Sequence, residues 1–209
     1  MAIEKRYDSI VEAARDVIAR HGYHQASIRR IARAAGLSLA GLYHYVGGKD
    51  ELLFLVLDRG LDRLLGALDV ALAAAPTAEL KLYALVRTHL EFAFQDAAAL
   101  KIINRDWELL LEPRRHEIVA RRAAYLGRGM AVLRELDPRR RSPDALYSAT
   151  NLLLAMLNGI ATRPFLRSAT GARALAGEVS TLFLHGFLDR SRDGHALATV
   201  PSEGETHEG

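Results

Sequence analysis

The chain has 209 residues, half of them apolar, and a formal net charge of +3, so it can bury a substantial core. It contains no cysteine, which excludes a disulfide framework, a zinc site with thiolate ligands and a cysteine nucleophile. Glu4, Lys5 and Arg6 are not followed by an apolar leader segment, and the longest apolar runs are too short to span a bilayer. We therefore expect a soluble, cytoplasmic protein without a membrane partner.

Charge is unevenly distributed along the chain. From His21 to Lys49 there is no Asp or Glu, while the same window holds Arg29, Arg30 and Arg33. A basic window without acids favours binding of a polyanion. The balance reverses from Ser191 to Gly209, where acidic residues predominate among Gly, Ser, Thr and Pro, a composition typical of a disordered tail.

Hydrophobic periodicity and capping residues predict four helices in the first third of the chain. They are one from Ile3 that stops at Gly22, one capped by Ser27 that stops at Gly36, one from Ser38 to Tyr45, and one from Lys49 to Ala75.

The rest of the chain also has helical periodicity, with prolines at most junctions. Helices are predicted over residues 78–95, 97–110, 113–136, 143–160 and 172–190. The fold class is therefore all-α, with about nine helices. Three parts are expected: a helix-turn-helix domain at residues 1–48, an effector-binding and dimerisation bundle at 49–190, and the tail at 191–209.

The segment from Ser27 to Tyr45 has the form of a helix-turn-helix, two short helices joined by a tight turn that contains Gly36. The second helix of such a unit enters the major groove, which is about 12 Å wide. Ser27, Ser38 and Lys49 all stand at helix starts, where free N–H groups favour phosphate oxygens. The sequence therefore predicts binding to double-stranded DNA.

This region resembles the TetR family of transcriptional regulators. The matching positions are Ser27, Ile31-Ala32, Ala35 to Ser38, Leu42 to Tyr45 and Lys49 to Leu52. The resemblance implies phosphate contacts from Tyr43, His44 and Lys49, contact of Leu39 and Ala40 with a thymine methyl, and reading of guanine by Arg29. The family usually has glycine where this chain has Ala40, and here Gly41 occupies a position that often reads bases, so Arg29 is expected to carry more of the specificity.

Two alternatives remain open at these positions. Tyr43 or Tyr45 could be a core aromatic, and Arg30 or Arg33 could belong to a solvated helix face. A helical interaction protein that has lost specific DNA binding is the alternative function.

The resemblance further implies a helical bundle that binds a small-molecule effector and forms a homodimer. The last two predicted helices carry more apolar residues than a helix needs to face a single core, between Leu146 and Ile160 and between Leu175 and Leu188. This excess suits an interface in which two helices from each copy form a four-helix dimer contact. The alternative is a buried helix pair inside a monomer. A two-fold dimer predicts an inverted-repeat operator.

The effector site is expected among aromatic and cationic residues of the middle helices, where an amphipathic anion could bind. The candidate residues are Tyr83, Arg87, Phe94, Trp107, Arg121 and Tyr125. The stretch from Asp106 to Arg121 is similar to a TetR subgroup that responds to acyl-CoA thioesters, although Asn158-Gly159 is not followed by the aromatic pair common in that subgroup. Arg87 or Arg121 could instead pair with a neighbouring Glu.

An enzyme is not expected, nor a metal or a cofactor. The chain lacks the Glu-x-x-His and His-Glu-x-x-His motifs of helical metal sites. The family default is a repressor that its effector releases from DNA, and the long helix from Lys49 could link the two sites mechanically.

Overall fold

A computed structural model describes residues 2–137, 142–163 and 171–188 of the chain. Within these residues the secondary structure consists of nine α-helices and one short 3-10 helix, and no strand is present, which confirms the all-α prediction. The elements are α1 (Ala2–His21), α2 (Ile28–Ala34), α3 (Leu39–Tyr43), α4 (Lys49–Ala73), α5 (Ala78–Gln95), α6 (Ala97–Arg105), η1 (Trp107–Leu109), α7 (Arg114–Leu136), α8 (Pro143–Ala161) and α10 (Gly171–Leu188). The predicted tail at 191–209 lies outside the described residues.

The helix expected over residues 97–110 is broken at Asp106. This residue is 3% exposed, and its carboxylate accepts hydrogen bonds from Arg105 Nε and Nη2, each at 2.7 Å. The backbone then tightens into η1, where the Leu109 N–H donates to the Asp106 carbonyl at 3.1 Å. Periodicity alone does not reveal this break, because a 3-10 turn keeps nearly the same spacing of apolar residues.

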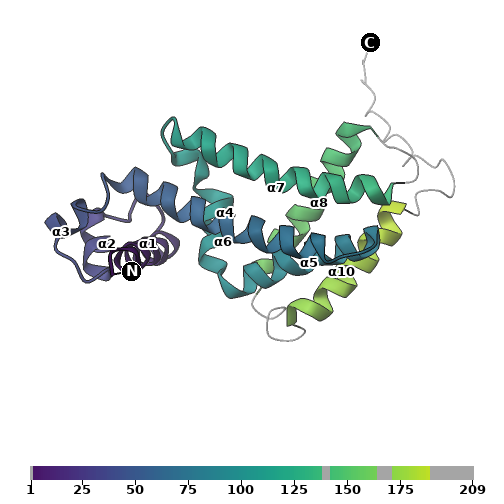
Figure 1. The fold of residues 1–209 in the computed structure, drawn as a ribbon, viewed down its shortest axis with the longest axis horizontal. Helices are drawn as coiled ribbons and strands as arrows, with labels where there is room; N and C mark the ends of the chain where they lie inside the picture. Colours follow the sequence, from purple (N-terminus) through teal and green to yellow (C-terminus); the bar gives the residue numbers. More distant parts are fainter. Residues whose placement is uncertain (1, 138–141, 164–170, 189–209) are drawn as a thin grey trace, which may run out of the picture.

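Helices α1 to α3 form a small unit at one end of the molecule (Figure 1). Ile10 and Ile18 of α1, Ile31 of α2 and Leu42 of α3 have no exposed surface. Burial of these side chains stabilises the unit, because each removes apolar area from water.

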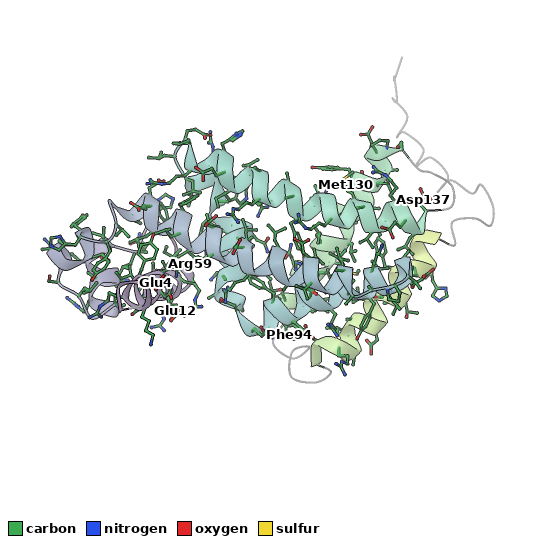
Figure 2. The ribbon with its side chains drawn as sticks, viewed as in Figure 1. Glu4, Glu12, Arg59, Phe94, Met130 and Asp137 are labelled. Atoms are coloured by element: carbon green, nitrogen blue, oxygen red, sulfur yellow. The ribbon has the colours of Figure 1, made fainter. Side chains whose placement is uncertain are left out.

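Helix α4 connects this unit to the rest of the protein. It contacts α1 of this unit and α5, α6 and α7 of the remaining helices. Arg59 lies where α1 meets α4 (Figure 2), and its Nη1 is 2.6 Å from Asp8 Oδ1. At the start of α4, Asp50 accepts hydrogen bonds from the Leu111 N–H at 3.0 Å and from Arg114 Nη1 at 2.8 Å. The predicted domain boundary at residue 48 therefore falls at the first turn of a helix that both parts share.

Helix α5 lies at the centre of the bundle, in contact with α4, α6, α7, α8 and α10. Half of its residues are buried for this reason, including the polar Thr88 and His89. No described helix is long and apolar enough to cross a membrane.

Candidate functional site

The turn between α2 and α3 is fixed by two serine caps and one glycine. Ser27 Oγ accepts from the Arg30 N–H at 3.2 Å, and Ser38 Oγ accepts from the Gly41 N–H at 3.0 Å. Gly36 has φ +67°, a left-handed conformation that side chains other than glycine rarely adopt. These local interactions hold the two short helices in the arrangement expected of a helix-turn-helix.

Most of the residues expected at DNA lie on the surface of this unit. Ser27, Arg29, Ser38, Ala40, Tyr43 and His44 are exposed, and Leu39, Gly41 and Lys49 are half-buried. Tyr43 is 51% exposed, whereas Tyr45 packs against the core. Arg29, Arg33 and Leu39 share a shallow groove between α2 and α3. The structure therefore brings the leading cationic candidate next to the start of α3.

Gly41 keeps the exposed face of α3 small. A Cβ atom at this position would lie 3.1 Å from Ser38 Oγ, the atom that caps the helix. A larger side chain would have to share the space with the cap. The surface that α3 offers is therefore made by Leu39, Ala40, Tyr43 and His44.

Lys49 is held by the turn between α1 and α2. Its Nζ donates to the His24 carbonyl at 3.1 Å and lies 4.3 Å from the centre of the Tyr23 ring. Partial burial lowers the pKa of Lys49. The ammonium group thus ties the start of α4 to the unit that carries α3.

A second site is a cavity of about 470 Å³ lined by residues of α4, α5, α6, η1, α7 and α8. Its apolar wall includes Leu61 and Leu64 of α4 and Leu100 and Ile103 of α6. The polar lining residues are His89, Asn104, Arg122, Tyr125, Tyr147, Asn151 and Asn158. A mostly apolar cavity with a few polar groups is typical of a small-molecule site.

The cavity contains two of the six residues expected at the effector, Trp107 and Tyr125. The other four do not line it. Tyr83 donates to the Arg173 carbonyl at 3.5 Å, Arg87 Nε lies 3.6 Å from Glu91 Oε1, and Phe94 packs against the core. Arg121 turns to α4, where it pairs with Asp58 at 2.8 Å and Asp62 at 3.2 Å.

The cation in the cavity wall is Arg122, the next residue along α7. Its guanidinium carbon lies 4.9 Å from the centre of the Trp107 ring, and its Nη1 donates to the Ile103 carbonyl at 2.5 Å. A signal for this placement exists in the sequence. Val119, Arg122 and Leu126 have the spacing of one helical face, and all three line the cavity.

Four polar side chains form two hydrogen-bonded pairs inside the cavity wall. Tyr125 Oη lies 2.9 Å from His89 Nδ1, and Asn104 Nδ2 donates to Asn158 Oδ1 at 2.8 Å. Burial raises the pKa of Tyr125, so the phenol stays protonated at neutral pH. Burial also lowers the pKa of His89 to about 4, although the Asn158 amide opposes this effect. His89 is therefore neutral at pH 7.

The buried His89 predicts a specific dependence of stability on pH. An unfolded histidine takes up a proton below its ordinary pKa of 6.5, whereas His89 in the folded protein does so only near 4. Between these values the unfolded state binds more protons, so stability falls as the pH falls. We expect this group alone to lower the free energy of unfolding by about 2 kcal/mol between about pH 7.5 and 5.

Urea unfolding across this range measures the effect. His89→Gln keeps an acceptor for the Tyr125 hydroxyl but cannot take up a proton, so the variant should lose this part of the pH dependence. If the free energy of unfolding changed with pH equally in wild type and variant, His89 would not be the group responsible.

Two family models match the chain. The model described as "Bacterial regulatory proteins, tetR family" matches residues 10–56, from α1 to the start of α4. The model described as "Tetracyclin repressor-like, C-terminal domain" matches residues 75–162, from the region before α5 through α8. The first contains the helix-turn-helix, and the second contains most of the cavity wall.

Individual relatives agree with these matches. The regulator BetI of Rhizobium meliloti (strain 1021) is 32% identical over 168 residues, which is 78% of this chain and 80% of BetI. Four other curated regulators match over shorter stretches, and the chain spans only 24% to 46% of their length.

Solved structures share the fold. A TetR-family regulator from Bordetella parapertussis 12822 superposes with a TM-score of 0.81 at 27% identity, covering 88% of this chain and 96% of that one. AibR in complex with isovaleryl coenzyme A and operator DNA gives a TM-score of 0.75 at 24% identity over 86% of this chain and 98% of AibR. Together with the family models and the BetI alignment, this shows that the chain belongs to the TetR family of bacterial regulatory proteins, whose members are DNA-binding regulators and not enzymes.

Proposed function

We propose that this protein is a transcription regulator that binds an inverted-repeat operator as a homodimer and is released from it by a small-molecule effector. The observation that carries the proposal is the capped α2–turn–α3 unit, whose exposed cations lie in a window without acids. Such a surface suits the phosphate backbone of DNA.

The individual contacts follow from position on this unit. Ser27 and Ser38 at the helix starts, with Tyr43, His44 and Lys49, bind phosphates and set the register on the duplex. Leu39 and Ala40 meet a thymine methyl, and Gly41 lets the α3 backbone approach the groove. Arg29 reads guanine from the groove beside α3.

The dimer forms through α8 and α10. Leu152 and Leu182 are each 70% exposed, and Tyr147 and Met156 are 53% and 37% exposed. Exposed leucines on two helices do not fit the alternative of a pair buried within a monomer, and a second copy of the chain would cover them. Both helices lie in the half of the molecule away from α3 (Figure 1), so a two-fold dimer presents two separate recognition helices.

The effector binds in the cavity between α4 and α8, and we propose an acyl-CoA thioester. The cavity joins an apolar wall to neutral amides and one arginine, which suits an acyl group with a polar arm. AibR, which has the same fold, holds isovaleryl coenzyme A. The effector releases DNA by binding better to a state in which the two α3 helices are wrongly spaced for the operator.

Arg29→Ala tests the DNA-binding proposal. We expect the variant to lose about 1 to 3 kcal/mol of operator binding and to relax the preference at one base position, because a bidentate contact to guanine is removed. Lys49→Ala is the comparison and should weaken operator and random DNA alike, since its contact is to phosphate. Fluorescence anisotropy with both DNAs over a range of salt concentrations measures these losses.

The same titrations separate the regulator from a helical interaction protein. A regulator prefers its operator and loses affinity steeply with salt. Equal losses on both DNAs for Arg29→Ala would remove the specificity assignment, and absence of an operator preference in wild type would favour the interaction protein.

A further inference from the structure

Arg122 is the single formally charged side chain at neutral pH among the described residues that line the cavity. The other polar groups there are amides, phenols, the Trp107 indole and the neutral His89. Since the described lining residues include no carboxylate, they offer nothing to neutralise a cationic ligand. Arg122 is therefore the one formal charge that the described part of the wall presents to a ligand.

Within the part of the chain that the structure describes, no carboxylate pairs with this guanidinium, unlike those of its neighbours on α7. Among the described residues, Arg114 pairs with Asp50, Arg121 with Asp58, and Arg128 with Asp69. Burial lowers the pKa of Arg122, and Glu108 opposes this through its charge without forming an ion pair with it. A partly buried cation without a paired carboxylate is unfavourable, and an anion bound beside it would relieve that cost.

The guanidinium is also held in place. The Trp107 ring supports one face, and the hydrogen bond from Nη1 to the Ile103 carbonyl fixes the plane of the group. That bond uses one of five N–H donors. A planar, fixed fork with free donors is suited to two parallel hydrogen bonds with a carboxylate or a phosphate.

We propose that Arg122 binds an anionic oxygen group of the effector, a carboxylate or a phosphate, while the apolar body of the same molecule lies against Leu61, Leu64 and Leu100. The inference rests on the proposed function, because it assigns the ligand chemistry of the cavity that we take to be the effector site. It also assigns an orientation, with the anionic end beside Arg122 and Trp107 and the apolar end toward α4 and Leu100.

Four eight-carbon probes test the proposal: octanoate, octanoyl-CoA, octanamide and octylamine. Calorimetry on the full chain should show that at least one of the two anions binds about tenfold or more tightly than octanamide, and that octylamine binds least. Tight binding of octanoate would show that Arg122 binds a carboxylate. Tight binding of octanoyl-CoA alone would show that it binds a phosphate. A preference for octylamine or octanamide overturns the proposal.

Two variants of Arg122 and one neighbour locate the effect. Arg122→Gln should lower the affinity for the anion about tenfold or more and leave the affinity for octanamide unchanged, because a charged hydrogen bond is lost. Arg122→Lys keeps the positive charge but not the planar fork of donors, so its affinity for the anion should lie between those of wild type and Arg122→Gln. Arg121→Gln, one residue away and outside the cavity, should bind like wild type. Thermal unfolding without ligand first establishes that each variant is folded.

The outcomes separate this proposal from the proposed function. Equal loss of anion binding in Arg121→Gln and Arg122→Gln overturns the role of Arg122. If wild type binds operator DNA but none of the four probes, the anion proposal is wrong and the regulator stands. If the anions bind through Arg122 but no operator is bound, the regulator is wrong and the anion site stands.

Discussion

Replacement of Leu152 by Asp is expected to convert the proposed dimer to a monomer and to lower operator affinity by about 100-fold or more. The side chain is 70% exposed on α8, so the carboxylate is harmless in a free monomer. In a two-fold interface the substitution occurs on both sides and buries an unpaired charge on each, at a cost of several kcal/mol. A monomer holds only one recognition helix and therefore only half of the operator contacts.

Sedimentation and operator titration measure the two effects. Val70→Asp is the matched control, because Val70 is 73% exposed and lies on α4, outside the proposed interface. The control should remain dimeric and bind operator like wild type. A dimeric Leu152→Asp protein with unchanged affinity would place the interface elsewhere on the surface, and Leu182→Asp would then show whether α10 takes part.

The helices could be predicted from the sequence because their signals are local. Ser27, Ser38 and Gly36 act within one turn of their own positions, and the structure shows both serine caps and the left-handed glycine. The all-α class and the order of the helices follow from such signals. The break at Asp106 does not, since it accompanies the burial of this carboxylate, which depends on how distant helices pack around it.

The cavity could be predicted only in part, because its lining depends on which face of each helix turns inward. Arg121 and Arg122 are adjacent, yet about 100° of helical rotation separates them. Arg121 meets the carboxylates of α4, and Arg122 meets the cavity. The partners of Arg121 come from a helix about sixty residues earlier in the chain. The composition of the sequence identified the segment of α7 that lines the cavity. Helix packing determined that Arg122, and not Arg121, faces it.

Asp96 lies at the junction between the helix-turn-helix unit and the cavity, and its contacts with distant helices could not be predicted from the sequence either. The sequence places it between two predicted helices, and the structure makes it the N-cap of α6, with Oδ1 accepting from the Ala99 N–H at 2.9 Å. Its Oδ2 accepts from Arg15 of α1 at 3.1 Å and from Arg63 of α4. Burial would raise the pKa of Asp96, but the bonds from Arg63 and Ala99 and the charge of Arg15 outweigh it and lower the pKa.

Asp96→Ala is expected to destabilise the protein by about 2 to 4 kcal/mol. The variant loses a helix cap and leaves Arg15 and Arg63 without this partner. This loss of stability is smaller than the loss expected on breaking a fully buried ion pair, since Arg63 is itself 56% exposed. Asp96→Asn keeps a cap acceptor and a neutral hydrogen bond, so it should cost less. Urea unfolding of both variants at neutral pH gives the difference.

The same substitution should weaken communication between the cavity and DNA. Asp96 caps α6, whose Leu100, Ile103 and Asn104 line the cavity, and it binds α1 of the helix-turn-helix unit through Arg15. If this contact transmits the effector signal, the ratio of operator affinities without and with effector should fall toward one in Asp96→Ala. The effector's own affinity should change little, because Asp96 does not line the cavity. An unchanged ratio would leave α4, with its contacts to both sites, as the path of coupling.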